Sequence, residues 1–266
     1  MKTVQTDVSL ERILISVIIP SYNRANTVGF TIDSILAQRV DANIEIVIGD
    51  DCSTDNAREV LLQYKEKYPT DYELFNKAMN GEVTLSGVEN YVCEKGSKIS
   101  TRKASGKLLN ALTSENPYII GGSADVASSV MTHLSHTTHI SKDDFNGQTL
   151  NYGIREFAMG AINNGIALHG GLVVFGGTFF VFSDYLKPSL RLSALMNLNN
   201  FMLFSHDSVA VGEDGPTHQP IEQLGTLRSI PNLNVYRPAD YKELLGAQFT
   251  IKETKGSPKE RLDSIL

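Results

Sequence analysis

The sequence predicts an α/β fold built on a mainly parallel sheet. Short apolar runs rich in β-branched residues, such as 13–20 and 44–51, have the length and composition of buried strands. Segments with apolar residues at helical spacing, such as 25–39 and 101–115, separate these runs. This alternation is the pattern of βαβ units, in which helices join parallel strands.

The N-terminal part predicts one strand-helix-strand-helix unit. Its strands are expected at 13–20, where a proline ends the run, and at 44–51. Its helices are expected at 25–39 and at 53–68, the second with Ser53 as N-cap. The polar segment that follows, up to about residue 100, shows no clear period, and we expect a connector with room for one short helix.

The α/β rhythm returns in the rest of the chain. Helices are predicted at 101–115, at 153–170, after Pro188 within 185–197, at 219–230 with Pro220 near the start, and from 241 onward. Strands are predicted at 118–125, 171–180, 199–207 and 232–240. The last fifteen residues, 252–266, are polar and charged, and we expect no strand in them.

Composition restricts the classes of protein to consider. A chain of 266 residues with 41% hydrophobic and 20% charged residues fits a globular protein of one large or two small domains. The net charge of −6 argues against nucleic acid or an anionic membrane as a partner. Two isolated cysteines, Cys52 and Cys93, fit a reducing compartment. No signal peptide or membrane-spanning run is present, so we expect a soluble cytoplasmic protein.

Three loops follow predicted strands: "GGSAD", "GGTFFVFSDY" and "SHDSVAVGEDGPTHQP". Ligands bind at the carboxyl ends of strands in parallel sheets, so we expect the three loops to lie together. The third loop holds His206, Glu213, Asp214 and His218 within 13 residues. This set suits proton transfer or polyol recognition, and the alternative is a polar surface loop.

Several other groups of side chains have both a functional and a structural interpretation. The aromatic residues of the second loop, Phe179, Phe180, Phe182 and Tyr185, could form core or an apolar slot for a planar ring. Arg102 and Lys103 could hold a phosphate or be solvated charges. Asp50, Asp51 and Asp55 could face a nucleotide or cap the next helix. Three histidines, His133, His136 and His139, suggest a metal site, but no acid or cysteine at ligand spacing joins them.

The stretch "GIREFAMG" raises a separate question. Its single acid, Glu156, has small residues around it, Gly153, Ala158 and Gly160 among them. Small residues allow a backbone or ligand to approach closely. We therefore expect this carboxyl group to face something other than water.

Residues ~100 to 246 resemble the pyrimidine-binding domain of transketolase, and the segment 68–82 continues this similarity upstream. The longest matching stretches are "KISTRKASGKLLNAL", "NYGIREFAMGAI", "GLVVFGGTFFVFSDY" and "HDSVAVGEDGPTHQPIEQL". The resemblance implies a three-layer αβα domain over 70–250, followed by a polar tail at 251–266. It also implies thiamine diphosphate as cofactor and sugar phosphates as substrates of a two-carbon ketol transfer.

The same resemblance implies roles for particular residues. Glu156 would contact N1′ of the aminopyrimidine ring and share a proton with it. Phe179, Phe182 and Tyr185 would form the aromatic slot for this ring, and Asp125 would be an acid on the cofactor side. His206, Asp214 and His218 match residues that hold substrate hydroxyls and move protons, with His206 and His218 as catalytic residues beside Glu156. Arg102 and Ser129 match sugar-phosphate contacts.

Residues 14–68 resemble the start of a family two nucleotide-sugar glycosyltransferase. The matching stretches are "ISVIIPSYNR", "TIDSILAQ" and "EIVIGDDCSTDNAREVL". The resemblance implies a partial domain over 1–69 whose uracil side is formed by Pro20, Tyr22, Asn23 and Asp50. A later Asp-x-Asp metal motif and a catalytic base region are missing.

The two resemblances together predict a chimera, through a gene rearrangement, a misassembled sequence or an artificial joining. The "GDG" motif and downstream asparagine that hold the diphosphate and Mg²⁺ in transketolases are not in this chain, so it contributes no metal ligand. We also expect the chain to stop before the last strand of the pyrimidine-binding domain, where the resemblance implies a further phosphate-binding arginine. The chain would then be a half-site that needs a partner chain with the diphosphate-binding domain, and it would form a homodimer as family members do. The alternatives are an inactive fusion and a glycosyltransferase fragment that binds a UDP-sugar.

Overall fold

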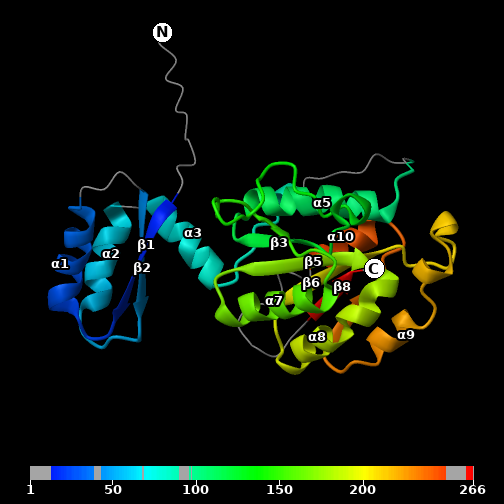
Figure 1. The fold of residues 1–266 in the computed structure, drawn as a ribbon. Helices are drawn as coiled ribbons and strands as arrows, with labels where there is room; N and C mark the ends of the chain where they lie inside the picture. The colour runs from blue at the N-terminus through cyan, green and yellow to red at the C-terminus, as the bar shows by residue number, and fades with distance from the viewer. Residues whose placement is uncertain are drawn as a thin grey trace, which may run out of the picture. The chain divides into compact units, whose positions relative to one another are not determined.

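A computed structural model describes residues 13–38, 43–67, 69–89, 96, 98–249 and 262–265. The chain divides into two compact units, which are described separately (Figure 1). The first comprises Met1–Leu74 with Ser141–Asn146, and the second comprises Phe75–Ile140 with Gly147–Leu266. None of the helices in the described ranges has the length and apolarity needed to cross a membrane.

The first unit confirms the predicted strand-helix-strand-helix order. It contains β1 (Ile13–Ser21), α1 (Ala25–Leu36), β2 (Asn43–Asp50) and α2 (Ala57–Lys67), and the two strands pair in parallel. The helix α3 (Pro69–Met79) spans the division between the units.

The predicted N-cap of the second helix is wrong. α2 begins at Ala57, and its first backbone N–H donates to the Asp55 carboxylate at 3.0 Å. Ser53 lies in the preceding turn, where its backbone N–H and hydroxyl both donate to Asp50. The turn is therefore longer than expected, because short polar side chains bond to the turn backbone instead of to the helix.

The second unit contains a six-stranded sheet in the order β4-β3-β5-β6-β8-β7, and all its pairs are parallel. Its strands are β3 (Ile119–Ser123), β4 (Thr149–Asn151), β5 (Val173–Phe179), β6 (Asn200–Ser205), β7 (Leu233–Tyr236) and β8 (Leu262–Ile265). Its helices are α4 (Ser86–Glu89), α5 (Thr101–Glu115), α6 (Ala127–Val130), α7 (Glu156–His169), α8 (Ser183–Leu195), α9 (Gln223–Arg228) and α10 (Tyr241–Phe249).

Both faces of this sheet are covered, which confirms the three-layer architecture. On one face, Phe175 and Phe201 pack with Leu108 of α5 and with α10. On the other face, Met202 of β6 packs with Met159 of α7 and with α8. Figure 1 shows α5 and α10 on one side of the sheet, with α7 and α8 on the other. Neighbouring residues of β6 thus point into opposite cores, as strand geometry requires.

The segment predicted as a connector is more ordered than its composition suggests. It contains α3 and α4, and three apolar residues near α4 are buried against α5: Val83, Leu85 and Val88. The buried Asn116 amide fixes the segment, because it donates to the Thr84 carbonyl at 2.8 Å and accepts from the Thr84 N–H at 2.8 Å. The Asn116 side chain, 32 residues away from Thr84, therefore orders a segment whose local sequence shows no periodic pattern.

The helix predicted to follow Pro188 begins earlier, at Ser183, and contains the proline. Leu186, Leu190 and Ala194 are buried along one side of α8, so tertiary packing outweighs the hydrogen bond lost at the proline. The helix predicted at 219–230 is shorter than expected, since α9 covers only Gln223–Arg228.

The expectation of a strandless tail is also wrong. β8 inserts between β6 and β7 and pairs in parallel with both, with Leu203 and Tyr236 opposite Ile265. Two flanking strands offer unpaired backbone N–H and C=O groups, and four residues suffice to satisfy them. The two flanking strands therefore favour a strand at 262–265, although the sequence there shows no apolar run.

The domain limits 1–69, 70–250 and 251–266 remain a proposal.

Candidate functional site

The carboxyl ends of β3, β5 and β6 lie side by side and carry the three loops singled out from the sequence. Ser123 at the end of β3 is paired with Gly177 of β5, and Phe179 at the end of β5 is paired with Ser205 of β6. The predicted convergence of the loops after β5 and β6 is confirmed by direct contacts between their rings. The sheet topology brings together residues that are far apart in sequence.

His206 is held by hydrogen bonds on both ring nitrogens. Nε2 lies 3.1 Å from Nη1 of Arg102, and Nδ1 lies 2.8 Å from the Ser205 hydroxyl. A guanidinium can only donate, so Nε2 accepts and the ring is neutral with its proton on Nδ1. The backbone of His206 has a φ of 58°, in the left-handed region that is unusual for a residue with a Cβ atom.

The electrostatic surroundings favour this neutral form. Burial lowers the pKa of the His206 imidazole below its ordinary value of 6.5, and the Arg102 guanidinium lowers it further. The carboxylates of Asp214 and Asp207 act in the opposite direction, and His218 adds to the lowering. The two effects named first prevail, which favours the neutral ring whose Nε2 accepts from Arg102.

A series of stacked rings extends from His206 toward the surface. Phe179 lies 4.0 Å from the His206 ring, and Phe182 lies 5.9 Å from Phe179, measured between centroids. His218 meets the edge of Phe182 at 5.2 Å, and Tyr185 is 6.0 Å from Phe182. Tyr185 is 64% exposed, so the outer end of this apolar surface is open. The same rings are thus available to an aromatic ligand.

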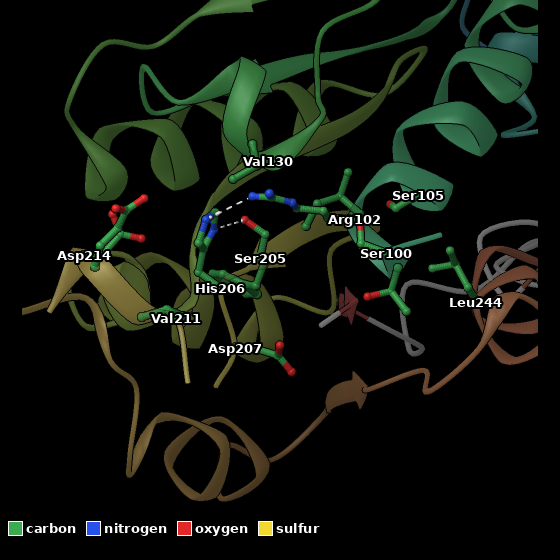
Figure 2. A pocket seen from close by; sticks show the side chains of 14 residues that line it. Ser100, Arg102, Ser105, Val130, Ser205, His206, Asp207, Val211, Asp214 and Leu244 are labelled. Carbon is green, nitrogen blue, oxygen red and sulfur yellow. Dashed lines mark hydrogen bonds between the residues drawn. The ribbon is translucent and has the colours of Figure 1, made fainter. Parts of the chain in front are cut away.

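A cavity of about 450 Å³ lies beside His206 (Figure 2). Arg102 and Asp214 line it from opposite sides, and Ser205 contributes at its base. Arg102 also donates to the backbone carbonyl of Ser129 at 3.4 Å. The cavity thus combines a cation, a neutral imidazole and hydroxyl groups, which suits an anionic, hydroxylated ligand.

Glu156 is the first residue of α7 and is 8% exposed. Within the described part of the chain, no side-chain hydrogen bond to its carboxyl group is found. The approach to the helix is set by Gly153, with a φ of 69°, and by Tyr152, whose hydroxyl donates to Asn163 of α7 at 2.5 Å. A largely buried carboxyl group with no side-chain partner is free to bond another molecule.

Asp125 follows β3 and is exposed, with a φ of 63°. Neither Asp125 nor Glu156 is among the lining residues of the His206 cavity. Both lie on segments that follow neighbouring strands, since β3 is paired with β4 and β5. The structure therefore places Asp125 and Glu156 outside the cavity beside His206.

The glycosyltransferase-like candidates meet at the carboxyl ends of β1 and β2. Pro20 is paired with Gly49, and Asp50 ends β2. Asn23 accepts from the Thr54 N–H at 2.8 Å, and Tyr22 is 56% exposed. Asn23 and Asp50 thus already hold the loop between β2 and α2, which is the structural interpretation of this acidic turn.

Two of the three spaced histidines have other polar partners. His136 Nε2 lies 3.1 Å from Gln148 Oε1, and His139 Nδ1 lies 3.2 Å from Asn151 Oδ1. Across the part of the chain that the structure describes, no group of three or more His, Cys, Asp or Glu residues could hold a metal ion.

Sequence reasoning missed Ser205, which directly precedes His206 and whose hydroxyl lies 2.8 Å from Nδ1 of its ring. It also missed Asp207 and Arg237, which form an ion pair of 2.7 Å between the ends of β6 and β7. Both lie toward the carboxyl ends of the predicted strands 199–207 and 232–240, which was a signal that could have indicated them.

Comparisons with known families and proteins agree with this geometry. The model described as "Transketolase, pyrimidine binding domain" matches residues 97–256, and "Glycosyl transferase family 2" matches residues 16–81. Both resemblances inferred from the sequence are confirmed.

Individual relatives are transketolases. The transketolase of Halalkalibacterium halodurans is 49% identical over 203 residues, which is 75% of this chain and 30% of that protein. The transketolase of Bacillus subtilis is 51% identical over 186 residues, 70% of this chain and 28% of that protein. The chain therefore spans less than a third of the length of these curated relatives.

Solved structures give the same result. Pichia stipitis transketolase in complex with sedoheptulose-7-phosphate superposes with a TM-score of 0.71 at 35% identity, over 79% of this chain and 32% of that one. Transketolase from Leishmania mexicana superposes with a TM-score of 0.71 at 26% identity, over 94% of this chain and 46% of that one. The family match covers more than half of the sequence, and the chain belongs to the transketolase pyrimidine-binding domain family.

Proposed function

We propose that the chain supplies the pyrimidine-binding half of a thiamine-diphosphate site for transfer of a two-carbon ketol unit between sugar phosphates. The observation that carries this proposal is Glu156, a buried carboxyl group at the start of α7 with no side-chain hydrogen bond among the described residues. A protonated ring nitrogen would satisfy it, and membership of the family supplies the candidate ring.

The residues present fit the pyrimidine end of the cofactor. Phe179, Phe182 and Tyr185 form an apolar surface with an exposed outer end, which suits a planar heterocycle. Asp125 would contact the cofactor from the end of β3. Thiamine diphosphate, when bound, supplies the nucleophilic carbon that takes up the two-carbon unit. Glu156 would hold a proton between its carboxyl group and N1′ of the ring.

The residues around His206 fit the sugar phosphate. Arg102, with its contact to the Ser129 carbonyl, would bind the phosphate, and the cavity beside it accommodates the sugar chain. His206 accepts on Nε2 from Arg102, so it would bind a sugar hydroxyl in exchange for this contact or, once protonated, the phosphate. Asp214 and His218 would bind the remaining hydroxyls and move protons.

The diphosphate end of the cofactor requires a partner. The described residues offer no metal cluster, so Mg²⁺ and the diphosphate would be held by a diphosphate-binding domain on another chain. A homodimer is also proposed, because α7 presents exposed apolar side chains at Phe157, Ile162 and Leu168. We propose a cytoplasmic location and neither a membrane nor a nucleic acid as partner, in keeping with the net charge of −6.

Thermal unfolding tests the cofactor proposal directly. A ligand that binds only the folded chain raises the midpoint, by about 2.7 kcal/mol of stability at a concentration 100 times its Kd. We expect thiamine diphosphate with Mg²⁺ to raise the midpoint of the purified chain and Glu156→Gln to abolish this rise. Glu222→Gln, at an exposed glutamate, is the matched control and should keep it. An equal shift in the Glu156→Gln variant would overturn the assignment of Glu156.

A second candidate function is the binding of a UDP-sugar by the first unit. It is favoured by the gathering of Pro20, Tyr22, Asn23 and Asp50 at one end of β1 and β2. We expect UDP with Mn²⁺ to bind in this case, with an affinity lowered by Asp50→Ala. Stabilisation by neither ligand would instead support an inactive fusion.

A further inference from the structure

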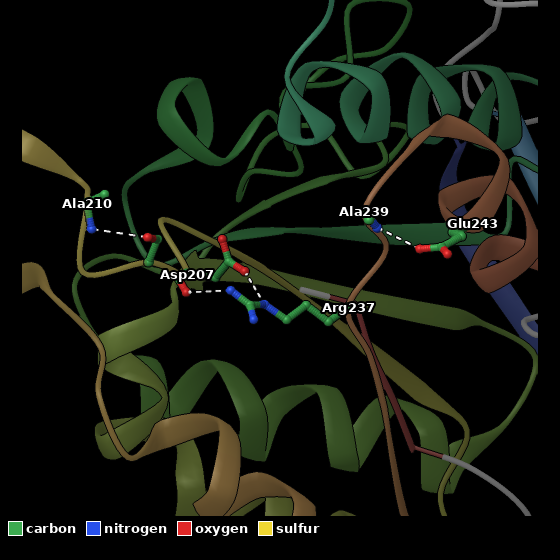
Figure 3. A network of polar contacts seen from close by, with 6 residues as sticks. Asp207, Ala210, Arg237, Ala239 and Glu243 are labelled. Atoms are coloured by element: carbon green, nitrogen blue, oxygen red, sulfur yellow. Dashed lines mark hydrogen bonds and ion pairs between the residues drawn. The ribbon is translucent and has the colours of Figure 1, made fainter.

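The loop after β6 is tied to the end of β7 by one side chain. Arg237 donates from Nε to the Asp207 carboxylate at 2.7 Å and from Nη2 to the Asp207 backbone carbonyl at 3.4 Å. Figure 3 shows both bonds, with Arg237 extended toward Asp207 across the gap between the two segments. The guanidinium group therefore binds both the side chain and the main chain of Asp207.

Asp207 directly follows His206, whose φ of 58° lies in the left-handed region. A residue with a Cβ atom keeps such a conformation only where its surroundings hold it there. The imidazole ring of His206 is held by Arg102 and Ser205. The main chain that follows His206 is held by Arg237, which bonds to the Asp207 carbonyl.

The strand order makes this link more than a local contact. β8 lies between β6 and β7, so those two strands exchange no ladder hydrogen bonds. Arg237, just beyond the end of β7 at Tyr236, reaches past β8 to the loop after β6. The ion pair thus links the ends of two strands that are not direct neighbours in the sheet.

We propose that Arg237 is a positioning residue for His206, which keeps the imidazole against the Phe179 ring and facing Arg102. The role of His206 toward a sugar phosphate rests on the proposed function, whereas the positioning itself does not. Arg237 is absent from the cavity lining, so its effect passes through Asp207.

The ion pair also changes which charges act on His206. The charged groups that face His206 are Arg102 of α5, Asp207, and Asp214 and His218 of the following loop. Arg237 neutralises the Asp207 carboxylate, which otherwise favours the protonated ring. Loss of Arg237 is therefore expected to raise the pKa of His206 as well as to release its ring.

The test follows the His206 ring by NMR in the full chain, with isotope-labelled histidine and with His206→Gln to assign the signal. The Phe179 ring lies 4.0 Å away, so the His206 ring protons carry an upfield ring-current shift in the wild-type chain. We expect Arg237→Gln to lose this shift and raise the pKa of His206, and Arg237→Lys to retain part of both. Arg228→Gln, at an exposed arginine of α9, should change neither.

An unchanged His206 shift and pKa in folded Arg237→Gln would overturn the proposal. If that variant does not fold, Asp207→Asn tests the proposal instead. It weakens the ion pair with Arg237 while keeping Arg237 itself and the side-chain volume at position 207. An unchanged ring-current shift in Asp207→Asn would then overturn it. Failure of the cofactor proposal looks different: thiamine diphosphate gives no thermal response while the His206 shift still depends on Arg237.

Discussion

The hydrogen bond between Tyr152 and Asn163 offers a direct test of how the approach to Glu156 is fixed. Tyr152 is 5% exposed and Asn163 is not exposed at all, and the two are joined by a bond of 2.5 Å. Burial raises the pKa of the Tyr152 phenol, so this hydroxyl remains a donor. Tyr152→Phe keeps the ring and removes only the oxygen.

The expected cost follows from what the variant leaves unpaired. Nδ2 of Asn163 already has no partner among the described residues. In Tyr152→Phe, Oδ1 of the same amide also loses the hydroxyl group that donates to it. A buried polar group left without a hydrogen bond costs about 1–3 kcal/mol. The thermal unfolding midpoint of a domain of this size falls by about 2–4 °C for each kcal/mol of lost stability.

The assay is urea unfolding followed by circular dichroism. Because the chain has two compact units, amide exchange of α7 peptides identifies the transition that belongs to the second unit. Tyr185→Phe is the matched control, since Tyr185 is 64% exposed and its loss of a hydroxyl should change stability by less than about 0.5 kcal/mol. Equal stability of Tyr152→Phe and the control would refute the reasoning.

Two further predictions concern helix packing and pH. A Cβ atom at Gly160 would lie 2.7 Å from Leu186 Cδ1 and 2.9 Å from Ser189 Cβ, so Gly160→Ala should destabilise the second unit by about 1–3 kcal/mol in urea unfolding. Gly165→Ala, with open space around its Cβ position, should instead stabilise α7 by about 0.5–1 kcal/mol; destabilisation by both would show that helix contact is not the cause. The folded chain holds the pKa of His206 below 6.5, so the unfolded chain binds this proton more readily. Stability should therefore fall as pH drops below about 6.5, and His206→Gln should remove this part of the pH dependence; an identical pH profile in that variant would contradict it.

Part of the candidate site was readable from the sequence because its residues sit directly after strands. His206 follows the apolar run of β6, and Phe179 closes the run of β5, so parallel pairing of β5 and β6 brings them together. The same logic fails for Ser205, whose side chain matters only because the His206 ring turns toward it.

Two misjudged elements show where local pattern stops being informative. The four residues of β8 carry no apolar run, and their conformation follows from the two strands that flank them. The helix α8 runs through Pro188 because three buried residues on one side outweigh one lost hydrogen bond. In both cases a contact far away in the sequence decides the local structure.

Local patterns in the chain were enough to predict the α/β rhythm, the two family resemblances and most candidate residues, because strand and helix periodicity and long motifs are local properties. The contacts of Arg102 with His206 and of Arg237 with Asp207, which join residues 104 and 30 positions apart, depend on the folded arrangement. The same arrangement also decides that Glu156 is buried without a side-chain hydrogen bond among the described residues. Such facts depend on the strand order of the sheet and on packing between elements, which no local pattern of residues encodes.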